Sequence, residues 1–316
     1  MDCLAVYQRI REAGIMPTTF VYDIAETVDL AGTLYENGIH VMEILQRTPD
    51  ALGAIEAVKR QLPGMLVGAG TVLTAETAEM AAGAGADYLV TPYYSQEIVD
   101  WCNRRRMAVI PGCGTVTEVS RGYQSGLRCF KYFPAKQLGG AEAIRQISEI
   151  YNDVRYIVTG GMDYDDLLEF SPIKHVAAVG TVCMMPRELI RAHSWAEIGE
   201  NTRKAVAGSL GLELAYVSSG SLSPAVTALA DMLRIYSHER HQVPEIPQSI
   251  RNLGGSHAAC FYTNSLERAL AFFQTYRAEW EILLREDDGS PVVADLRLPI
   301  LGETIRLVSR YYIYRT

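Results

Sequence analysis

The sequence predicts an α/β protein: a (β/α)8 TIM barrel over residues 1–207, followed by a smaller α+β domain of βαβββ type over residues 212–316. Short apolar runs alternate with helical patterns eight times in the first region. These runs are apolar on both faces, as expected for strands of a parallel sheet that helices cover. Beyond the first region the alternation ends, and near the C-terminus a single helix is followed by three strands in succession.

The barrel elements are expected as strand–helix pairs. Gly38 ends the first helix, and Pro49 stands near the start of the second, where its missing amide proton costs nothing. Eight such pairs in roughly 190 residues fit a compact barrel. The pairs are Met16–Tyr22 with Ile24–Glu36, His40–Leu45 with Pro49–Gln61, Met65–Gly68 with Thr74–Gly83, Tyr88–Val90 with Gln96–Arg105, Ala108–Ile110 with Thr117–Tyr123, Leu127–Lys131 with Gly140–Ile150, Arg155–Val158 with Asp163–Phe170, and Val176–Val179 with Pro186–Ala192.

A doubly wound open sheet is the structural alternative for this region. Such a sheet usually has fewer strands, and in its nucleotide-binding form a Gly-x-Gly-x-x-Gly turn follows the first strand. That turn is missing after Met16–Tyr22, so the barrel is the better prediction.

The second domain is expected after a closing helix, Trp195–Ala207, and a boundary at Gly208–Gly211. The pattern that follows suggests two unequal copies of one small α+β module. Its expected elements are the strand Leu212–Ser218, the helix Ala225–Ile235, the strand Gly255–Tyr262, the helix Ser265–Tyr276, and the strands Trp280–Arg285, Pro291–Leu298 and Thr304–Ser309.

Composition narrows the class of protein. The chain has 316 residues, 29 basic against 37 acidic side chains and a net charge of −8, which disfavours a nucleic-acid partner. Its six cysteines are scattered, without Cys-x-x-Cys spacing, so a reducing cytoplasm is expected rather than a disulfide framework or zinc site. The N-terminus has no signal-peptide core, and no apolar segment is long enough to span a membrane.

Polar residues at the ends of the expected strands indicate chemistry, because active sites of barrels lie at the C-terminal ends of their strands. Glu43 and Arg47 lie at the end of the second strand, and Thr71 lies just after the third. Lys131 lies in an aromatic run at the end of the sixth strand, where enclosing an ammonium group is costly. Most such lysines reach the surface, but one placed so that its amine is kept neutral can act as a nucleophile toward a carbonyl. An arginine could bind a carboxylate there, and Glu43 could carry protons.

Six motifs, in this order, resemble the 2-keto-3-deoxy-6-phosphogluconate (KDPG) / 4-hydroxy-2-oxoglutarate (KHG) aldolase family. The resemblance covers residues 1 to about 207. The motifs are Glu43-x-x-x-Arg47-Thr48-Pro49, Gly68-Ala69-Gly70-Thr71-Val72, Pro111-Gly112, Lys131-x-Phe133-Pro134-Ala135, Gly139-Gly140 and Thr159-Gly160-Gly161.

The resemblance implies a class I aldolase that cleaves a 2-oxo acid to pyruvate and an aldehyde without a metal. Lys131 would form the Schiff base, so no separate cofactor is expected, and Glu43 would move protons through a water. The resemblance also implies substrate contacts: Arg47 and Thr71 for the carboxylate, Pro92 and Phe133 as walls, and Thr159, Gly160, Gly161, Gly180 and Thr181 at the distal end.

The sequence departs from the family at the end of the eighth strand. The family usually has Gly-Gly-Ser there, which helps bind phosphate, whereas this chain has Gly180-Thr181-Val182. The expected substrate is therefore left open between a 2-keto-3-deoxy sugar acid, its 6-phosphate and 4-hydroxy-2-oxoglutarate. The family resemblance also suggests a homo-oligomer, specifically a trimer.

The second domain is similar to a module of the vicinal-oxygen-chelate (glyoxalase-like) superfamily. The similarity rests on Gly255-Ser256-His257-Ala258-Ala259-Cys260 and Thr263-Asn264-Ser265-Leu266-Glu267-Arg268-Ala269. Active members bind a divalent metal through His and Glu, but His257 has no carboxylate partner in the pattern, and Tyr216 takes its place in the first copy. We therefore expect no metal site and a structural His257.

Two other functions remain open on the sequence. One is a non-catalytic, regulatory protein that binds a metabolite on an aldolase-like barrel. The other is a phosphate-binding barrel isomerase or synthase, in which Lys131 acts only as a point charge. Trapping of pyruvate on Lys131 separates the aldolase from both.

Overall fold

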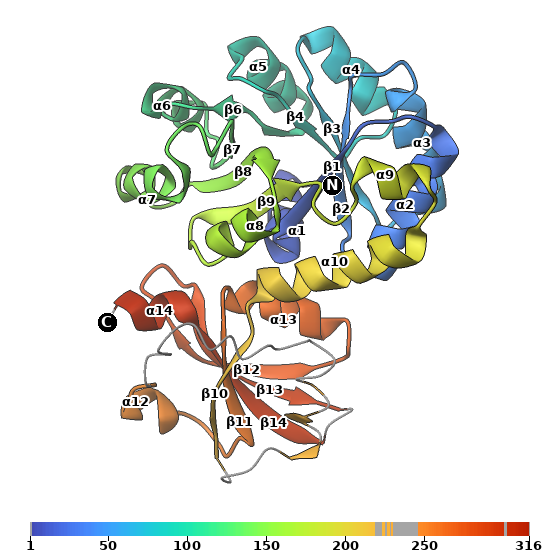
Figure 1. The fold of residues 1–316 in the computed structure, drawn as a ribbon. Coiled ribbons are helices and arrows are strands. Elements are labelled where there is room, and N and C mark those ends of the chain that lie inside the picture. The colour runs from blue at the N-terminus through green and yellow to red at the C-terminus, as the bar shows by residue number, and fades with distance from the viewer. Residues whose placement is uncertain are drawn as a thin grey trace. The chain divides into compact units, whose positions relative to one another are not determined.

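The structure is a computed structural model that describes residues 2–218, 246–299 and 302–315, together with 223, 224, 226, 227 and 229. The chain divides into two compact units, Met1–Val206 and Ala207–Thr316 (Figure 1). The helix expected at Ala225–Ile235 falls largely outside the described residues.

Unit 1 is a parallel barrel. Where its strands pair they are parallel, and among the described residues their order around the sheet is β5-β4-β3-β2-β1-β9-β8-β7-β6. The strands are β1 (Ile15–Thr19), β2 (Val41–Leu45), β3 (Leu66–Gly70), β4 (Tyr88–Val90), β5 (Ala108–Ile110), β6 (Gly112–Cys113), β7 (Cys129–Tyr132), β8 (Arg155–Met162) and β9 (Val176–Thr181).

The two ends of this sheet meet at Pro111, which separates β5 from β6. The Lys131 amide donates a hydrogen bond of 2.9 Å to the Pro111 carbonyl, so β7 pairs with β6 and is bonded to the break itself, and it also contacts β5. β5 and β6 thus form one barrel strand, and the predicted barrel of eight strand positions is confirmed. The first strand is shorter than expected: β1 ends at Thr19, which leaves Phe20 and Tyr22 in the following loop.

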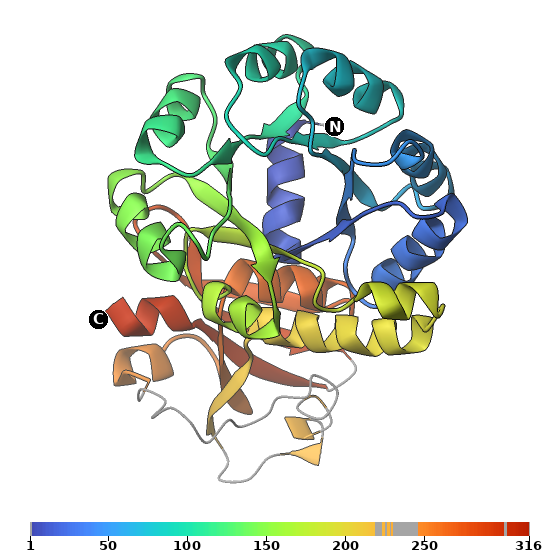
Figure 2. The same ribbon diagram turned by 45° about the horizontal axis from the view of Figure 1, so that its top comes forward.

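Helices surround the barrel as a ring, most clearly in the tilted view of Figure 2. Capping boxes start three of them: the side chain of Thr74, Thr115 or Asp163 accepts from the third helical residue, which fixes the loop before it. The helices are α1 (Cys3–Ala13), α2 (Ile24–Glu36), α3 (Ala51–Gln61), α4 (Ala75–Gly83), α5 (Gln96–Arg105), α6 (Val116–Gln124), α7 (Gly140–Ile150), α8 (Tyr164–Phe170), α9 (Arg187–Arg191) and α10 (Trp195–Leu210).

Helix α1 covers the N-terminal end of the barrel and was not among the predicted strand–helix pairs. It ends at Ala13, just before β1, and packs against β1, β2, β5 and β9. The Tyr7 hydroxyl donates to the Val109 carbonyl at 3.0 Å, and the Val109 amide donates to that hydroxyl. Among the described residues, α1 thus covers one end of the barrel and leaves the C-terminal ends of the strands uncovered.

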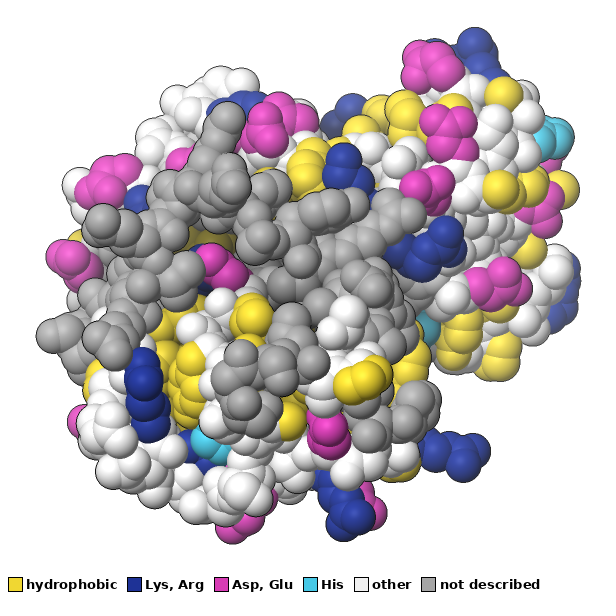
Figure 3. Space-filling view, turned by 60° about the horizontal axis from the view of Figure 1, so that its bottom comes forward, with side chains coloured by type: hydrophobic (Ala, Val, Ile, Leu, Met, Phe, Trp, Pro, Cys, Tyr) yellow, Lys and Arg dark blue, Asp and Glu magenta, His cyan; other side chains and the backbone are white. Residues whose placement is uncertain are grey.

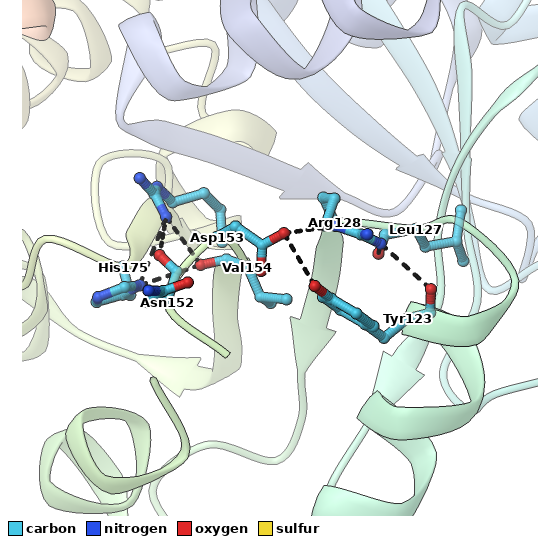
Figure 4. Close-up of polar contacts among 8 residues, drawn as sticks. Tyr123, Leu127, Arg128, Asn152, Asp153, Val154 and His175 are labelled. Carbon is cyan, nitrogen blue, oxygen red and sulfur yellow. Dashed lines mark hydrogen bonds and ion pairs between the residues drawn. The ribbon is translucent and has the colours of Figure 1, made fainter. Parts of the chain in front are cut away.

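Polar contacts join elements around the N-terminal end (Figure 4). Arg128 donates to Asp153 at 2.7 Å, and its guanidinium lies 3.7 Å from the centre of the Tyr123 ring. The Tyr123 hydroxyl also donates to Asp153. Polar groups at this end of a barrel usually serve stability rather than chemistry.

Unit 2 is an α+β fold with the sheet order β10-β11-β14-β13-β12 among its described residues. β11 and β14 are parallel, and the other neighbours are antiparallel. From β11 onward the order along the chain is β-α-β-β-β, as predicted. The elements are β10 (Glu213–Val217), α12 (Gln248–Arg251), β11 (Ala259–Thr263), α13 (Leu266–Gln274), β12 (Glu279–Arg285), β13 (Pro291–Leu298), β14 (Glu303–Ser309) and α14 (Arg310–Arg315).

Two predictions near unit 2 are corrected. Helix α10 continues past its predicted end at Ala207 through Gly208, Ser209 and Leu210, and it ends only where Gly211 adopts a φ of 56°. His257 lies before β11 rather than within it. Its ring nitrogen Nε2 is 2.6 Å from the Tyr216 hydroxyl.

A buried ion pair holds the sheet of unit 2 to α12. Arg306 is fully buried on β14 and forms two hydrogen bonds with Asp295 on β13, at 2.7 and 2.8 Å. It also donates to the carbonyls of Ile250, Arg251 and Leu253, at and just after the end of α12. One side chain thus satisfies the last turn of a helix and neutralises a buried carboxylate.

The described surface carries mixed charge. Acidic, basic and hydrophobic side chains are interspersed on the described part of the face in Figure 3, without an extended basic area. Within the parts of the chain that the structure describes, no helix is long and apolar enough to cross a membrane.

Candidate active site

The register of the strands directs Glu43 and Lys131 into the barrel. Glu43 pairs with Thr18 on β1 and with Gly68 on β3, while Lys131 pairs with Gly112 and Ile157 on the strands beside β7. Paired residues of neighbouring parallel strands face the same side of the sheet. Across the interior, Lys131 Nζ lies 3.4 Å from Glu43 Oε1. The Glu43 side chain is fully buried and that of Lys131 is 10% exposed.

Close packing around the site requires glycine at three positions. A Cβ on Gly70 would collide with the Glu43 carboxylate, and one on Gly68 with the ring of Tyr88. A Cβ on Gly112, the register partner of Lys131, would collide with the backbone of Pro92. Both glycines of the Gly-x-Gly sequence at the end of β3 therefore have a steric reason: Gly70 leaves space for the Glu43 carboxylate and Gly68 for the Tyr88 ring.

Two buried oxygens in this region have no hydrogen-bond partner among the described residues. They are Glu43 Oε2 and Thr159 Oγ1, and Thr159 pairs in register with Gly180. Buried polar atoms are nearly always hydrogen-bonded, so unpaired ones at the open end of a barrel indicate a place for water or ligand.

Arg47 and Thr71 meet at the mouth. Arg47 Nε donates to Thr71 Oγ1 at 3.2 Å, and the guanidinium lies 5.5 Å from the centre of the Phe20 ring. Thr71 has a φ of 59°, a left-handed conformation that is unfavourable for a β-branched residue. Strained residues concentrate at functional sites, where surrounding structure holds them in place. The other N–H donors of the Arg47 guanidinium have the geometry that suits a planar anion such as a carboxylate.

The two predicted wall residues flank the same opening. Phe133 is partly exposed, and its ring centre lies 5.4 Å from Lys131 Nζ. Pro92 is also partly exposed, directly after the buried Thr91. Phe133 therefore shields one side of the lysine amine from water.

The predicted distal residues lie on β8 and β9, and the pairing of these strands shifts between Thr159 and Met162. Gly160 and Gly161 have φ values of 125° and 67°, and a Cβ on Gly160 would lie 3.1 Å from the Cα of Pro134. Gly180 faces Thr159. The Thr181 hydroxyl, in contrast, donates to Met162 O at 2.6 Å and accepts from the Cys183 amide at 3.0 Å. The Thr181 hydroxyl is therefore hydrogen-bonded within the protein, and contact of this residue with substrate stays a prediction.

Sequence reasoning missed four residues near the mouth. Thr18 is the register partner of Glu43 and is partly exposed. Phe20, Tyr22 and Arg187 form a stacked row with Arg47 on the neighbouring loops. The pair Thr18-Thr19 at the end of the first strand was the available signal, whereas the stack depends on loop geometry that local patterns do not encode.

No metal-binding arrangement is present in the described residues: no group of three or more His, Cys, Asp or Glu side chains is placed to hold an ion.

A family model described as "KDPG and KHG aldolase" matches residues 6–201. The chain belongs to the KDPG and KHG aldolase family.

Curated relatives agree with this assignment. The chain is 33% identical over 201 residues to a 2-dehydro-3-deoxy-phosphogluconate aldolase of Pseudoalteromonas atlantica. The matched region covers 64% of this chain and 94% of that protein. It is 30% identical over 195 residues to the KHG/KDPG aldolase of Escherichia coli K12, covering 62% and 92%.

Solved structures of aldolases share the barrel. The KDPG aldolase of Legionella pneumophila, captured with pyruvate as a covalent carbinolamine intermediate, has a TM-score of 0.61 and 31% identity, covering 64% of this chain and 97% of that one. The KDPG aldolase of Zymomonas mobilis ZM4 with 3-phosphoglycerate has a TM-score of 0.60 and 30% identity, covering 65% and 94%. The protein is accordingly a class I aldolase, which is a lyase.

Proposed function

We propose that Lys131 is the Schiff-base residue and that Glu43 moves protons for it. The observation that carries this assignment is the buried contact of 3.4 Å between Lys131 Nζ and Glu43 Oε1. Within the described residues, the second carboxylate oxygen has no protein partner, so it can accept from a water or a substrate hydroxyl.

The remaining contacts follow the geometry of the mouth. Arg47 and Thr71 hold the carboxylate of the 2-oxo acid, because the guanidinium and the hydroxyl lie side by side there. Phe133 and Pro92 shield the reacting carbon from water. Thr159 faces the distal end of the substrate with its unpaired hydroxyl. Gly160, Gly161 and Gly180 contribute backbone at the same end.

These groups suffice for carbon–carbon cleavage. The Lys131 amine adds to the keto carbon, and loss of water from the carbinolamine leaves a protonated imine. Glu43 takes the proton of the C4 hydroxyl, through a water. The C3–C4 bond then breaks, its electrons pass into the imine, and an aldehyde leaves. Protonation of the enamine at C3 and hydrolysis of the imine release pyruvate and restore the amine.

The proposed substrates are a 2-keto-3-deoxy sugar acid, its 6-phosphate (KDPG) and 4-hydroxy-2-oxoglutarate. The names of the curated relatives support the last two. Cleavage rates on all three, measured by pyruvate release with and without borohydride, test the assignment. Failure to release pyruvate from any of the three would contradict it.

The protein is further proposed to assemble as a homo-oligomer, specifically a trimer. Leu73, Tyr93, Val116 and Leu138 are 46%, 46%, 41% and 36% exposed and follow β3, β4, β6 and β7. Exposed apolar residues on adjacent loops favour contact with a second copy of the chain. Light scattering at several concentrations tests this, and a monomer throughout would contradict it.

Unit 2 is proposed to be a glyoxalase-like module that supports assembly or binds a small metabolite. The βαβββ order of its elements supports this. A cytoplasmic location is proposed as well, because all six cysteines are free thiols. Titration calorimetry with divalent ions tests the module: binding at His257 would contradict the structural role expected for that residue.

A further inference from the structure

Four side chains from three neighbouring loops stack in a row at the barrel mouth. Arg47, after β2, lies 5.5 Å from the Phe20 ring centre. Phe20 and Tyr22, both after β1, have ring centres 6.4 Å apart and an interplanar angle of 30°. Arg187, the first residue of α9 after β9, lies 4.3 Å from the Tyr22 ring centre. Two guanidinium groups thus flank a pair of aromatic rings.

Both rings are unusually exposed for their size. Phe20 is 39% and Tyr22 is 43% exposed, although each belongs to the loop directly above the interior of the barrel. A guanidinium that stacks on a ring keeps its N–H donors at the edge, directed to the side. The rings therefore orient the two guanidinium groups without occupying their donors.

Arg187 differs from the other basic side chains on these loops. Lys136, after β7, is bound by Asp166 at 2.7 Å and by Asp163 at 3.5 Å. Arg47 already meets Thr71. Arg187, in the part of the chain that the structure describes, contacts only the face of Tyr22. Its donors face solvent at the mouth.

The backbone that carries Arg187 is fixed. Met184 and Met185 are buried, and the Met185 amide donates to the Val182 carbonyl at 2.9 Å. β9 lies between β1 and β8 in the sheet, so this loop adjoins the Thr159–Gly161 segment. That is the side where the aldehyde end of the substrate is proposed to lie.

The end of β9 offers few donors to this part of the site. Val182 is 48% exposed and apolar, and the Thr181 hydroxyl and the Cys183 amide are bonded to each other. The side-chain donor already proposed for an anionic substrate tail is the neutral Thr159 hydroxyl, which carries no charge to balance the anion. A guanidinium held on Tyr22 supplies that charge.

We propose that Arg187, positioned by Tyr22, binds an anionic group, carboxylate or phosphate, at the aldehyde end of the substrate. The inference rests on the proposed function. It makes Arg187 a specificity-determining residue that contacts substrate and Tyr22 a positioning residue. Loss of a charge-assisted hydrogen bond predicts a fall of about 10- to 100-fold in kcat/KM for a tail that carries the anion.

The test compares three substrates: KDPG with a phosphate tail, 4-hydroxy-2-oxoglutarate with a carboxylate tail, and 2-keto-3-deoxygluconate, which has the carbon chain of KDPG without phosphate. Each is assayed with wild type, Arg187→Ala, Arg187→Lys and Tyr22→Leu. Arg191→Ala is the matched control, because it removes the same charge from the same short helix at an exposed position.

The proposal predicts that Arg187→Ala lowers kcat/KM for at least one anionic-tail substrate about 10- to 100-fold more than for 2-keto-3-deoxygluconate, mainly through KM. The substrate with the larger loss identifies the anion. Arg187→Lys should recover part of the loss, and Tyr22→Leu should cost a few-fold, the size of an exposed cation–π contact.

Equal losses on all three substrates, or equal effects of Arg187→Ala and Arg191→Ala, would overturn the proposal. Borohydride trapping of pyruvate separates this failure from that of the proposed function. If wild type traps pyruvate on Lys131 and Arg187→Ala leaves the substrate preference unchanged, only the role of Arg187 is wrong. If wild type traps none, the proposed function fails and this inference with it.

Discussion

Lys131 and Glu43 are 88 positions apart in the chain, yet the Nζ and Oε1 atoms of their side chains lie 3.4 Å apart inside the barrel. The lysine comes from β7 and the glutamate from β2, and the strands β1, β9 and β8 lie between them in the sheet. Each alone is an ordinary strand residue. Together they form a buried amine–carboxylate pair at the only end of the barrel that α1 does not cover.

Glu43→Gln keeps the size of the side chain but removes its ability to take a proton. We expect kcat for cleavage to fall about 10²- to 10⁴-fold, the usual contribution of a general acid–base group. KM should change little, because Arg47 and Thr71 are untouched. Steady-state pyruvate release measures both constants. A variant with wild-type kcat would remove Glu43 from the mechanism.

Gly70→Ala tests whether the position of the Glu43 carboxylate matters. The added methyl group would occupy the space of that carboxylate and push it away from Lys131. We expect at least a 100-fold loss in kcat, comparable to misplacing a catalytic group by about 1 Å. Gly32→Ala is the control, since its Cβ would meet nothing within 4 Å. Equal activity of the two variants would contradict the packing argument.

The sequence was sufficient to predict the elements of the barrel because each strand is a short apolar run and each helix has a clear stop or cap. The helix Ile24–Glu36 and the strand Ala108–Ile110 match their predicted bounds. Apart from helix α1, which was not predicted, the errors described for the barrel lie at the ends of elements. β1 is shorter than Met16–Tyr22, since its pairing with β2 stops at Thr19 and the N-cap Asp23 starts the next helix. Helix α10 runs through Gly208 because helical hydrogen bonds outweigh the low propensity of one glycine.

The location of the site was predictable from polar residues at the ends of the expected strands, since Lys131 and Glu43 meet inside the barrel and Arg47 follows β2 at the same end. The site was not predictable where a role depends on the direction in which a side chain points and on the groups that it bonds. Thr181 looked available from its place after Gly180, but its hydroxyl is bonded to Met162. Arg187 looked like an ordinary helix residue, and only the stack on Tyr22 sets it apart.

Arg306→Met tests the buried ion pair of unit 2. The change leaves Asp295 buried without its counter-charge, which should lower the free energy of unfolding of this unit by about 3–5 kcal/mol. Hydrogen exchange of peptides from β13 and β14 measures the loss in the full chain. The double change Arg306→Met with Asp295→Leu should recover much of it. Unchanged protection in the single variant would contradict the role of the pair.

His257 should make unit 2 less stable in acid. Burial lowers the pKa of His257 below its ordinary value of 6.5, and the charge of Arg306 lowers it further. The unfolded chain therefore binds the proton more tightly. The contribution of the neutral His257 to the free energy of unfolding is present above about pH 6.5 and is lost as the pH falls below that value. Protonation also removes a ring acceptor for the Tyr216 hydroxyl.

The measurement for His257 is hydrogen exchange of β11 peptides, with wild type and His257→Asn compared at the same pH. The difference in protection between the two proteins should be larger at pH 7.5 than at pH 5.5. Because the two proteins are compared at the same pH, the pH dependence of the intrinsic amide exchange rate does not affect the difference. A difference that is constant, or larger in acid, would show that His257 does not resist protonation in the folded unit.

The role of Lys131 as the Schiff-base residue is tested most directly by reducing the protein with sodium borohydride in the presence of pyruvate and mapping the modified peptide by mass. We predict one reduced pyruvyl group per chain, on Lys131, and none in Lys131→Arg. Lys136→Arg, on the loop after the same strand, should be modified like wild type. Modification of Lys136 or another lysine, or no modification with pyruvate, would contradict the assignment.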